Sequence, residues 1–231
     1  TFIDAASAGA DGYLSRSTTV RGAAGGTTKQ ISYYSGTESG EEVISWSQEY
    51  NSLGAVKTLS VYNNASDSVL QDVTVYKDSS VKTPSTFDKA TFNFTTLVKK
   101  SFTDYAGSVK GEEKSNYTWN YKADGIAVDT TTTYLYNAGF VSATLAGADG
   151  YLSKSTTVRG TAGTTKQVSY YSGTESGEEV ISWSQEYNSL GGVKTLSVYN
   201  NDSDSVLQDV TVYKDSSVRI PSTFDKATFN F

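Results

Sequence analysis

The strongest constraint on this chain is that it contains one long stretch twice. Residues 11–94 and 149–231 align with seven substitutions and the loss of one glycine of the pair Gly25-Gly26. Even loop residues are retained, as in SGTESGEE at Ser35–Glu42 and Ser172–Glu179, although surface substitutions usually change stability little. We therefore infer a recent duplication in a chain built of repeats. The substituted pairs are Arg16/Lys154, Ala23/Thr161, Ile31/Val168, Ala55/Gly192, Ala65/Asp202, Lys82/Arg219 and Thr83/Ile220.

The repeated unit is longer than its nearly identical part. FIDAASAGADGYL from Phe2 corresponds to FVSATLAGADGYL from Phe140, and Phe2–Ala10 is predicted to end a strand and enter a turn. The expected domains are a first repeat period over residues 1–139 and a second, incomplete period over residues 140–231. Thr95–Gly139 occurs once, so we expect the chain to be part of a longer repetitive protein.

Composition and patterning indicate an all-β fold. The chain has 17 Tyr, only two Pro and no clear helical periodicity, and Thr and Tyr favour half-buried strands. Val43–Tyr50 alternates, and Val56–Tyr62 and Val69–Tyr76 read as a hairpin with the polar tip Asn63–Ser68. Short turns predict an antiparallel meander of hairpins in tandem repeats, stacked in a solenoid-like manner. Tandem β-sandwich domains are the alternative architecture.

Other segments are less regular. Lys77–Phe87 contains Pro84 and is predicted to be a crossing loop, followed by a further strand at Ala90–Leu97. Lys99–Lys114 is charged, and a short helix there is an open alternative. Ile126–Tyr136 is predicted to be a long strand with a Thr run.

A smaller motif recurs within this pattern: an aromatic residue, then Asn or Lys, a turn, and a β-branched residue. It occurs as WNYKADGIAV from Trp119, YLYNAGFVSAT from Tyr134, QEYNSLGAVKT from Gln48 and SVYNNASDSVL from Ser60. These segments resemble the tyrosine–aspartate (YD) repeats of Rhs-type and teneurin-type proteins. That resemblance implies hairpins wound into a long β-sheet spiral or shell, outside cells or in secreted toxins, and carries over no catalytic residue. The family's Asp after Tyr is replaced here, and its following Gly-Arg pair is missing. The replacing residues are Asn51, Asn63, Lys122 and Asn137.

The residue types for most enzyme chemistry are absent. With no His and no Cys, the common base and nucleophile pairings cannot form, so we predict no enzyme and no cofactor. The carboxylates of Ser35–Glu42 and Ser172–Glu179 are predicted to be solvated loop charges, although a glycosidase also uses two carboxylates. The tip at Asn63–Ser68 is rich in oxygen but lacks the spacing of a calcium loop, so no metal site is predicted.

Binding partners are constrained by charge and by surface motifs. A net charge of −6 argues against nucleic acid, and no apolar run approaches the about 20 residues of a membrane span. Asn64, Asn116 and Asn201 open candidate glycosylation triplets, and Asn93 opens a fourth. Aromatic residues are predicted core anchors, with stacking on sugars as the alternative. The tryptophans concerned are Trp46, Trp119 and Trp183.

We interpret the chain as a non-enzymatic structural repeat protein, extracellular or at the cell surface, forming a segment of a long fibre, filament, sheath or adhesin stalk. The expected partners are neighbouring repeats or copies of the chain itself, in a homo-oligomer or filament, and also glycans. Two alternatives are a carbohydrate- or receptor-binding adhesin module and a YD-type shell of a secreted toxin.

Overall fold

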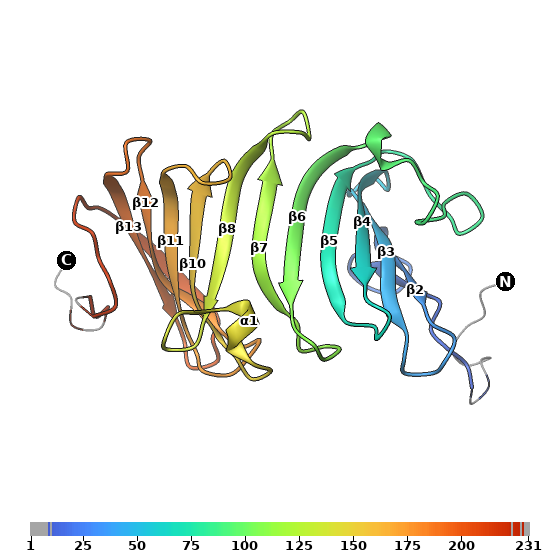
Figure 1. Cartoon of the computed structure of the whole chain (residues 1–231), viewed down its shortest axis with the longest axis horizontal. Coiled ribbons are helices and arrows are strands. Elements are labelled where there is room, and N and C mark those ends of the chain that lie inside the picture. Colours follow the sequence, from blue (N-terminus) through green and yellow to red (C-terminus); the bar gives the residue numbers. More distant parts are fainter. Residues whose placement is uncertain (1–8, 10, 223, 227, 229–231) are drawn as a thin grey trace. The chain divides into compact units, whose positions relative to one another are not determined.

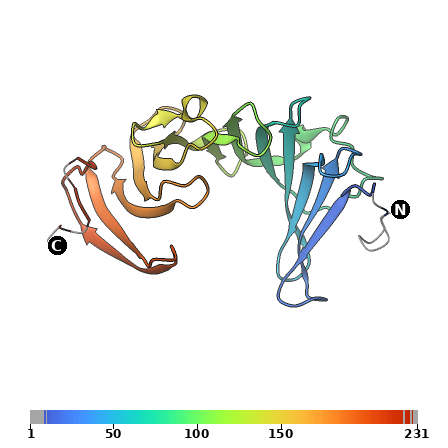
Figure 2. The ribbon, with the colours of Figure 1, turned by 90° about the horizontal axis from the view of Figure 1, so that it is seen from below.

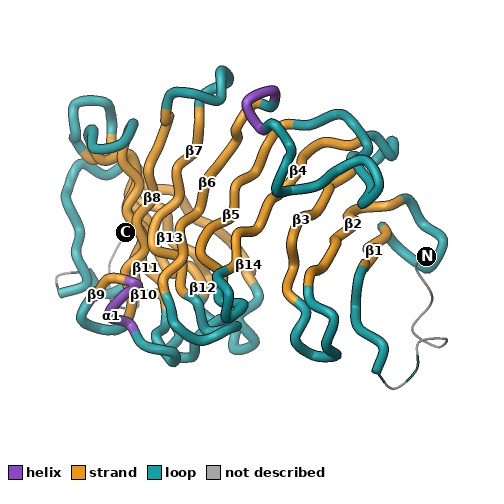
Figure 3. Tube along the Cα trace, turned by 45° about the vertical axis from the view of Figure 1, so that its right-hand side comes forward, coloured by secondary structure: helices purple, strands orange, loops and turns teal. Residues whose placement is uncertain are grey.

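The computed structural model describes residue 9 and residues 11–222, 224–226 and 228. The predicted strand end and turn at Phe2–Ala10 therefore lie outside the described residues, apart from Gly9. The predicted all-β fold is confirmed: the described strands form one antiparallel sheet whose order follows the chain, with β9 paired to β8 (Figures 1 and 3). The only helices among these residues are the 3-10 helix η2 and the one-turn helix α1. The elements are β1 (Arg16–Val20), β2 (Thr28–Ser35), β3 (Val43–Tyr50), β4 (Val56–Asn64), β5 (Leu70–Lys77), η2 (Phe94–Thr96), β6 (Val98–Ala106), β7 (Lys114–Tyr121), β8 (Val128–Tyr136), β9 (Val141–Ser142), α1 (Ala143–Ala146), β10 (Leu152–Arg159), β11 (Thr165–Ser172), β12 (Val180–Tyr187), β13 (Val193–Asn201) and β14 (Leu207–Lys214).

The chain divides into two compact units, which are described separately. The first comprises residues 1–104 and 121–127, and the second comprises residues 105–120 and 128–231. β2, β3 and β4 lie side by side in the first unit, and β11, β12 and β13 are the corresponding strands of the second (Figures 1 and 2). Each unit therefore contains one nearly identical copy of the repeated stretch.

The register of the first unit places aromatic and apolar residues in a row across its strands. Tyr33 pairs with Trp46, and Trp46 pairs with Val61. One residue along each strand from this row lies a second row of paired small side chains, Ser32, Ser47 and Ser60. Because successive residues of a strand face opposite sides, the serine row lies on the other face of the sheet. Alternation in the sequence is therefore translated directly into two chemically different faces.

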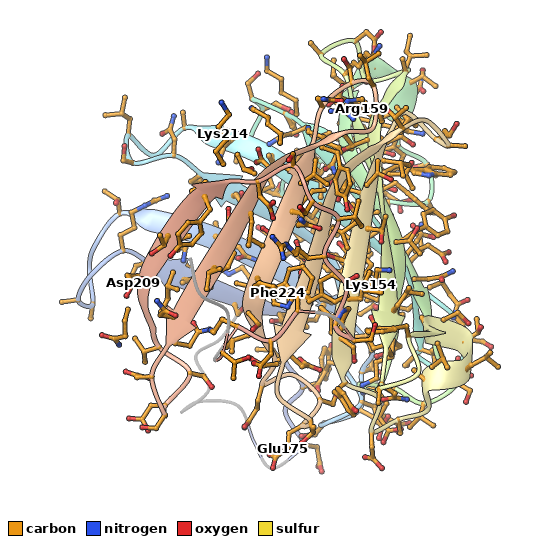
Figure 4. The ribbon with its side chains drawn as sticks, turned by 90° about the vertical axis from the view of Figure 1, so that its left-hand side faces the viewer. Lys154, Arg159, Glu175, Asp209, Lys214 and Phe224 are labelled. Carbon is orange, nitrogen blue, oxygen red and sulfur yellow. The ribbon has the colours of Figure 1, made fainter. Side chains whose placement is uncertain are left out.

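The apolar face of each unit is covered by a loop and not by a second sheet. In the first unit Tyr33, Trp46, Leu59 and Tyr76 pack with Phe87, which lies in the connection between β5 and β6. In the second unit Phe224, which follows β14, fills the corresponding place over Tyr170 and Trp183, and Figure 4 shows it over the face of the strands. We call residues 78–97 the first covering segment and residues 215–228, as far as they are described, the second covering segment.

This arrangement corrects two predictions and disfavours the alternative fold. The predicted strand at Ala90–Leu97 is wrong, because the backbone there closes local turns such as Phe92 N to Asp88 O at 2.9 Å and then forms η2. The open helical alternative for Lys99–Lys114 is also wrong, because β6 pairs with β5 over Val98–Asp104. Since all the described strands belong to one sheet, the described part of neither unit is a β-sandwich.

Candidate functional site: clamped covering segments and the edge strand β14

A buried glutamine fastens each covering segment to the sheet. Gln48 on β3 is 0% exposed; its Nε2 donates to the carbonyl oxygen of Ser80 at 2.8 Å, and its Oε1 accepts from the backbone N–H of Lys82 at 2.9 Å. One side chain thus satisfies a donor and an acceptor of a loop that has no neighbouring strand, and such groups are costly to leave unpaired when buried.

The second unit repeats this glutamine clamp with the same geometry. Gln185 is 1% exposed, donates to the carbonyl oxygen of Ser217 at 2.7 Å and accepts from the N–H of Arg219 at 2.8 Å. The clamp is therefore kept although Lys82 in the first copy is replaced by Arg219 in the second, because the bond at that position uses only the backbone N–H and the other bond uses the carbonyl oxygen of a serine present in both copies.

An ion pair within each covering segment forms a second fastening. Lys82 Nζ lies 3.1 Å from Asp78 Oδ2 in the first unit, and Arg219 Nε lies 3.0 Å from Asp215 Oδ2 in the second. Burial alone raises the pKa of Asp78, but hydrogen bonds from Ser80 and the charge of Lys82 outweigh it and hold the pKa below its ordinary value. The carboxylate is therefore the stable form in the folded protein.

The pKa of Asp215 is lowered in the same way. Burial acts to raise it, while hydrogen bonds from the Arg219 side chain and from the Ser217 backbone, with the Arg219 charge, lower it further than burial raises it. The Lys/Arg difference between the copies therefore conserves a cation at this position.

A lysine fixes the far part of each covering segment. Lys89 Nζ donates to the carbonyl oxygen of Tyr62 at 2.7 Å, and Lys226 donates to that of Tyr199. Burial lowers the pKa of Lys89, and the nearby charge of Asp72 acts in the opposite direction. The glutamine and this lysine hold each covering segment against its sheet face at two points, and the ion pair braces the segment internally.

Stacked rings fill the space beneath the covering segments. Trp46 stacks on Tyr33 with ring centroids 4.0 Å apart and meets Phe87 edge-on at 4.8 Å. The corresponding distances in the second unit are 4.1 Å from Trp183 to Tyr170 and 4.7 Å from Trp183 to Phe224. Because Trp46 and Trp183 are 6% and 5% exposed, neither ring face is open to a sugar.

Trp119 differs from the other two tryptophans. It lies on β7, is partly exposed and packs against Tyr117 with centroids 5.1 Å apart. The structure does not bring Trp119 into either of the two core clusters.

The candidate glycosylation residues occupy different settings. Nδ2 of Asn64 donates to the carbonyl oxygen of Ile44 at 2.9 Å, and Nδ2 of Asn201 donates to that of Ile181 at 2.9 Å, so both amides stabilise the ends of hairpins. Asn116 is a half-buried residue of β7, and Asn93 caps η2. Glycosylation of Asn64, Asn116 and Asn201 stays a prediction.

The loop glutamates have a structural role that was not expected. Glu42 Oε1 accepts from the N–H of Leu14 at 2.6 Å and its Oε2 from Gly40 at 2.9 Å; Glu179 does the same with Leu152 and Gly177. Figure 4 places Glu175 of this loop and Arg159 at opposite ends of the strands.

A third loop of this kind was missed in the sequence. In Gly107–Glu113, Glu113 Oε2 accepts from the N–H of Gly111 at 2.9 Å, as Glu42 does from Gly40. Gly40 and Gly111 have φ of 86° and 85°, a conformation that favours glycine. The spacing G-x-x-x-G-E-E, shared with Gly36–Glu42, was the signal that relates β6 and β7 to β2 and β3.

Arginine fastens the opposite end of the strands. Arg21, just after β1, donates to the carbonyl oxygens of Thr28 at 2.7 Å and Tyr50 at 2.5 Å. Arg159, at the end of β10, donates to those of Thr165 at 2.7 Å and Tyr187 at 2.9 Å. Each guanidinium therefore ties two successive hairpins together by satisfying their terminal carbonyls.

The second unit also has a shallow groove with a volume of about 450 Å³. It lies between the loop after β6 and the residues around α1, and small residues such as Gly107, Ala143 and Gly147 form much of its lining. Lys114 in its wall donates to Ser176 Oγ at 2.5 Å. Within the described residues there is no group of three or more acidic, His or Cys side chains placed to hold a metal ion.

β14 is the end strand of the sheet in the part of the chain that the structure describes. Val206, Leu207, Val210 and Val212 are 56%, 51%, 42% and 60% exposed. Asp209 and Lys214 lie toward opposite ends of β14 (Figure 4). This strand is therefore an apolar, exposed sheet edge.

The comparisons with known proteins do not assign a family. No protein family and no curated protein matches the chain. Among solved structures, a protein of unknown function from Bacteroides fragilis matches at 12% identity and a TM-score of 0.17, over 67% of this chain and 91% of that one. A similarity that low supports no argument about fold or function. No helix in the described part of the chain is long and apolar enough to span a membrane.

Proposed function

We propose that this chain is a non-enzymatic structural repeat protein, a segment of a long fibre, filament, sheath or adhesin stalk on the outside of the cell. The observation that supports this most strongly is the repeated glutamine clamp, Gln48 on residues 80 and 82 and Gln185 on residues 217 and 219. Each repeat carries its own covering segment, so each sheet face is covered by residues of the same copy. Further repeats can therefore be added to the chain, because each one brings the residues that cover its own apolar face.

The three fastenings fit a load-bearing role. The glutamine clamp, the ion pair and the lysine all bind backbone or charge within one copy, and they recur in the other. Interactions made within one copy stabilise each added repeat by itself, in addition to the contacts it makes with its neighbours. The expected partners are neighbouring repeats or further copies of the chain.

A sugar-binding module has less support. Its most suitable rings, Trp46 and Trp183, are buried beneath Phe87 and Phe224. A sugar would have to use other rings, such as the partly exposed Trp119.

The test is to measure particle length against the number of repeats. The 231-residue chain and versions with residues 2–139 repeated once and three times would be purified and examined by electron microscopy and small-angle scattering. A structural rod increases its largest dimension by the same amount for each added period. A closed hollow particle would favour the toxin-shell alternative, and a largest dimension that does not grow would contradict the proposal.

A further inference from the structure

Two strands of identical sequence have different neighbours in this protein. β5 (Leu70–Lys77) and β14 (Leu207–Lys214) both read LQDVTVYK. β5 lies between β4 and β6, whereas β14 pairs with β13 and, among the described residues, with no strand on its other side. The first copy therefore shows what the outer edge of this sequence binds when it is occupied.

The occupant of the β5 edge is β6, held in a defined antiparallel register. Val73 pairs with Thr103, Thr74 with Phe102 and Val75 with Ser101. The register then shifts by one residue, so that Tyr76 pairs with Lys99 and Lys77 with Val98. The edge therefore accepts one particular alignment of VKKSFTDY.

Occupation of the edge changes the exposure of this strand. Thr74 is 7% exposed, and Val73 and Val75 are partly buried. Their counterparts Val210 and Val212 are 42% and 60% exposed, and Thr211 is exposed as well. Since the two sequences are the same, the difference comes from the surroundings, and a strand beside β14 would cover apolar surface and pair its edge backbone groups.

We propose that the outer edge of β14 is an acceptor site for an extended strand with the sequence pattern of β6, supplied by a further repeat. The interaction is β-strand addition, in which backbone hydrogen bonds provide affinity and alternate side chains provide register. The strand takes the β5–β6 alignment, so its counterpart of Ser101 lies opposite Val212 and its counterpart of Thr103 lies opposite Val210. This inference rests on the proposed structural function and identifies the surface through which repeats are joined.

A disulfide trap tests both the site and the register, because the natural chain has no Cys. The full chain carrying Val212→Cys would be mixed, under mild oxidation, with a synthetic peptide of residues 96–107 carrying Ser101→Cys. Directly opposed residues in antiparallel strands have Cα atoms about 4.5–5.5 Å apart, which a disulfide can span. We expect the mixed disulfide to exceed, by about tenfold, that formed with a Thr103→Cys peptide, which is out of register.

The chain itself offers a matched control. Val75→Cys places the thiol in the same local sequence, but beside an edge that β6 already fills, so we expect little cross-linking to the same peptide. Val210→Cys with the Thr103→Cys peptide should cross-link as well as the first pair. Circular dichroism of each variant checks that it is folded before oxidation.

Three outcomes would overturn the inference. These are equal cross-linking in and out of register, equal cross-linking of Val75→Cys and Val212→Cys, and disulfide-linked chain dimers in place of peptide adducts. The last would mean that β14 edges pair with each other. If peptide capture fails while the chains with added repeats still lengthen as rods, the acceptor site is wrong and the structural function stands. If both fail, the structural function is wrong too.

Discussion

The hairpin β4–β5 of the first unit and the hairpin β13–β14 of the second have the same strand sequences, yet their burial differs, least at the inner strand and most at the outer one. Leu59 and Leu196 are 0% and 1% exposed, whereas Val56, Thr58 and Ser60 are buried on β4 and their counterparts Val193, Thr195 and Ser197 are only partly buried on β13. Val69 is 3% exposed, but its counterpart Val206 is 56% exposed. The central leucine of the inner strand is thus buried in both copies, whereas the environment of the outer strand depends on the next strand.

The covering segments also differ in exposure between the two units, by a smaller amount. The side chains of the ion pair are 9% and 3% exposed for Lys82 and Asp78, but 23% and 12% exposed for Arg219 and Asp215. Substitutions in the covering segment and in the groups that bind it should therefore cost more in the first unit.

The largest effect is expected for the tryptophans. Trp46→Ala and Trp183→Ala should each lower the free energy of unfolding by about 4 kcal/mol, because both rings are buried to the same degree and removal of either leaves a cavity. Denaturant unfolding followed by circular dichroism gives the values, and hydrogen exchange shows which unit is affected. Trp119→Ala is the control and should cost less than either. A loss at Trp183 much smaller than the loss at Trp46 would contradict the equal burial of the two rings.

The ion pair should give the next largest difference. Asp78→Asn should destabilise the chain by about 3 kcal/mol at pH 7, because it leaves a buried Lys82 unpaired, and Asp215→Asn by about 1 kcal/mol. Urea unfolding at several pH values measures both, with Asp88→Asn as an exposed control.

The pH dependence of this effect follows from the lowered pKa of Asp78. Its stabilisation is fully present above the unfolded-state pKa of about 3.9 and is lost as the pH falls through the lower folded-state pKa. The difference between the native chain and Asp78→Asn should therefore shrink below about pH 4. A difference that stays constant down to pH 2 would exclude the carboxylate as its source.

Substitutions of the clamp glutamines should give the next largest loss of stability. Gln48→Ala removes the partners of the Ser80 carbonyl and the Lys82 N–H, and we expect a loss of about 2 kcal/mol, against about 1 kcal/mol for Gln185→Ala, where water reaches the more exposed covering segment. Gln48→Glu is the matched substitution: it keeps an acceptor for Lys82 but turns a carboxylate oxygen toward the Ser80 carbonyl oxygen at a position that is 0% exposed, so its cost at pH 7 should be at least that of Gln48→Ala. Proteolysis of the covering segment is a second readout, and unchanged cleavage would count against the clamp.

The smallest effect compares the two outer strands directly. Val75→Thr should cost about 1 kcal/mol, whereas Val212→Thr, at a largely exposed position, should stay within about 0.5 kcal/mol of the native chain. Thermal unfolding of the two variants measures the difference. If the two substitutions cost the same, β6 does not cover Val75 in the way that the exposure values indicate.

Much of the fold could be predicted because its pattern is local. Val43–Tyr50 alternates at the period of a strand, and β3 has those bounds. Trp46 could be identified as a core residue for the same reason. Gln48 could not, because a polar residue in an alternating strand is equally compatible with solvent and with a partner from a distant loop.

Ala90–Leu97 shows where local pattern fails. Its alternating Phe92 and Phe94 suit a strand, but they equally suit a turn-rich segment whose rings point into an aromatic face, and Trp46, Tyr33 and Tyr76 provide that face only after folding. The role of Glu42 was missed for a similar reason, since its partner Leu14 is 28 residues away.

The order of hairpins and the chemistry of each sheet face were thus determined by residue alternation and by turn residues, which act over a few neighbouring positions in the sequence. The covering segments, the clamp residues and the burial of LQDVTVYK were decided by tertiary contacts. The same eight residues are half-covered as β5 and exposed as β14. Strand pairing joins segments that are separate in sequence, and one strand alone cannot specify whether its outer edge is filled.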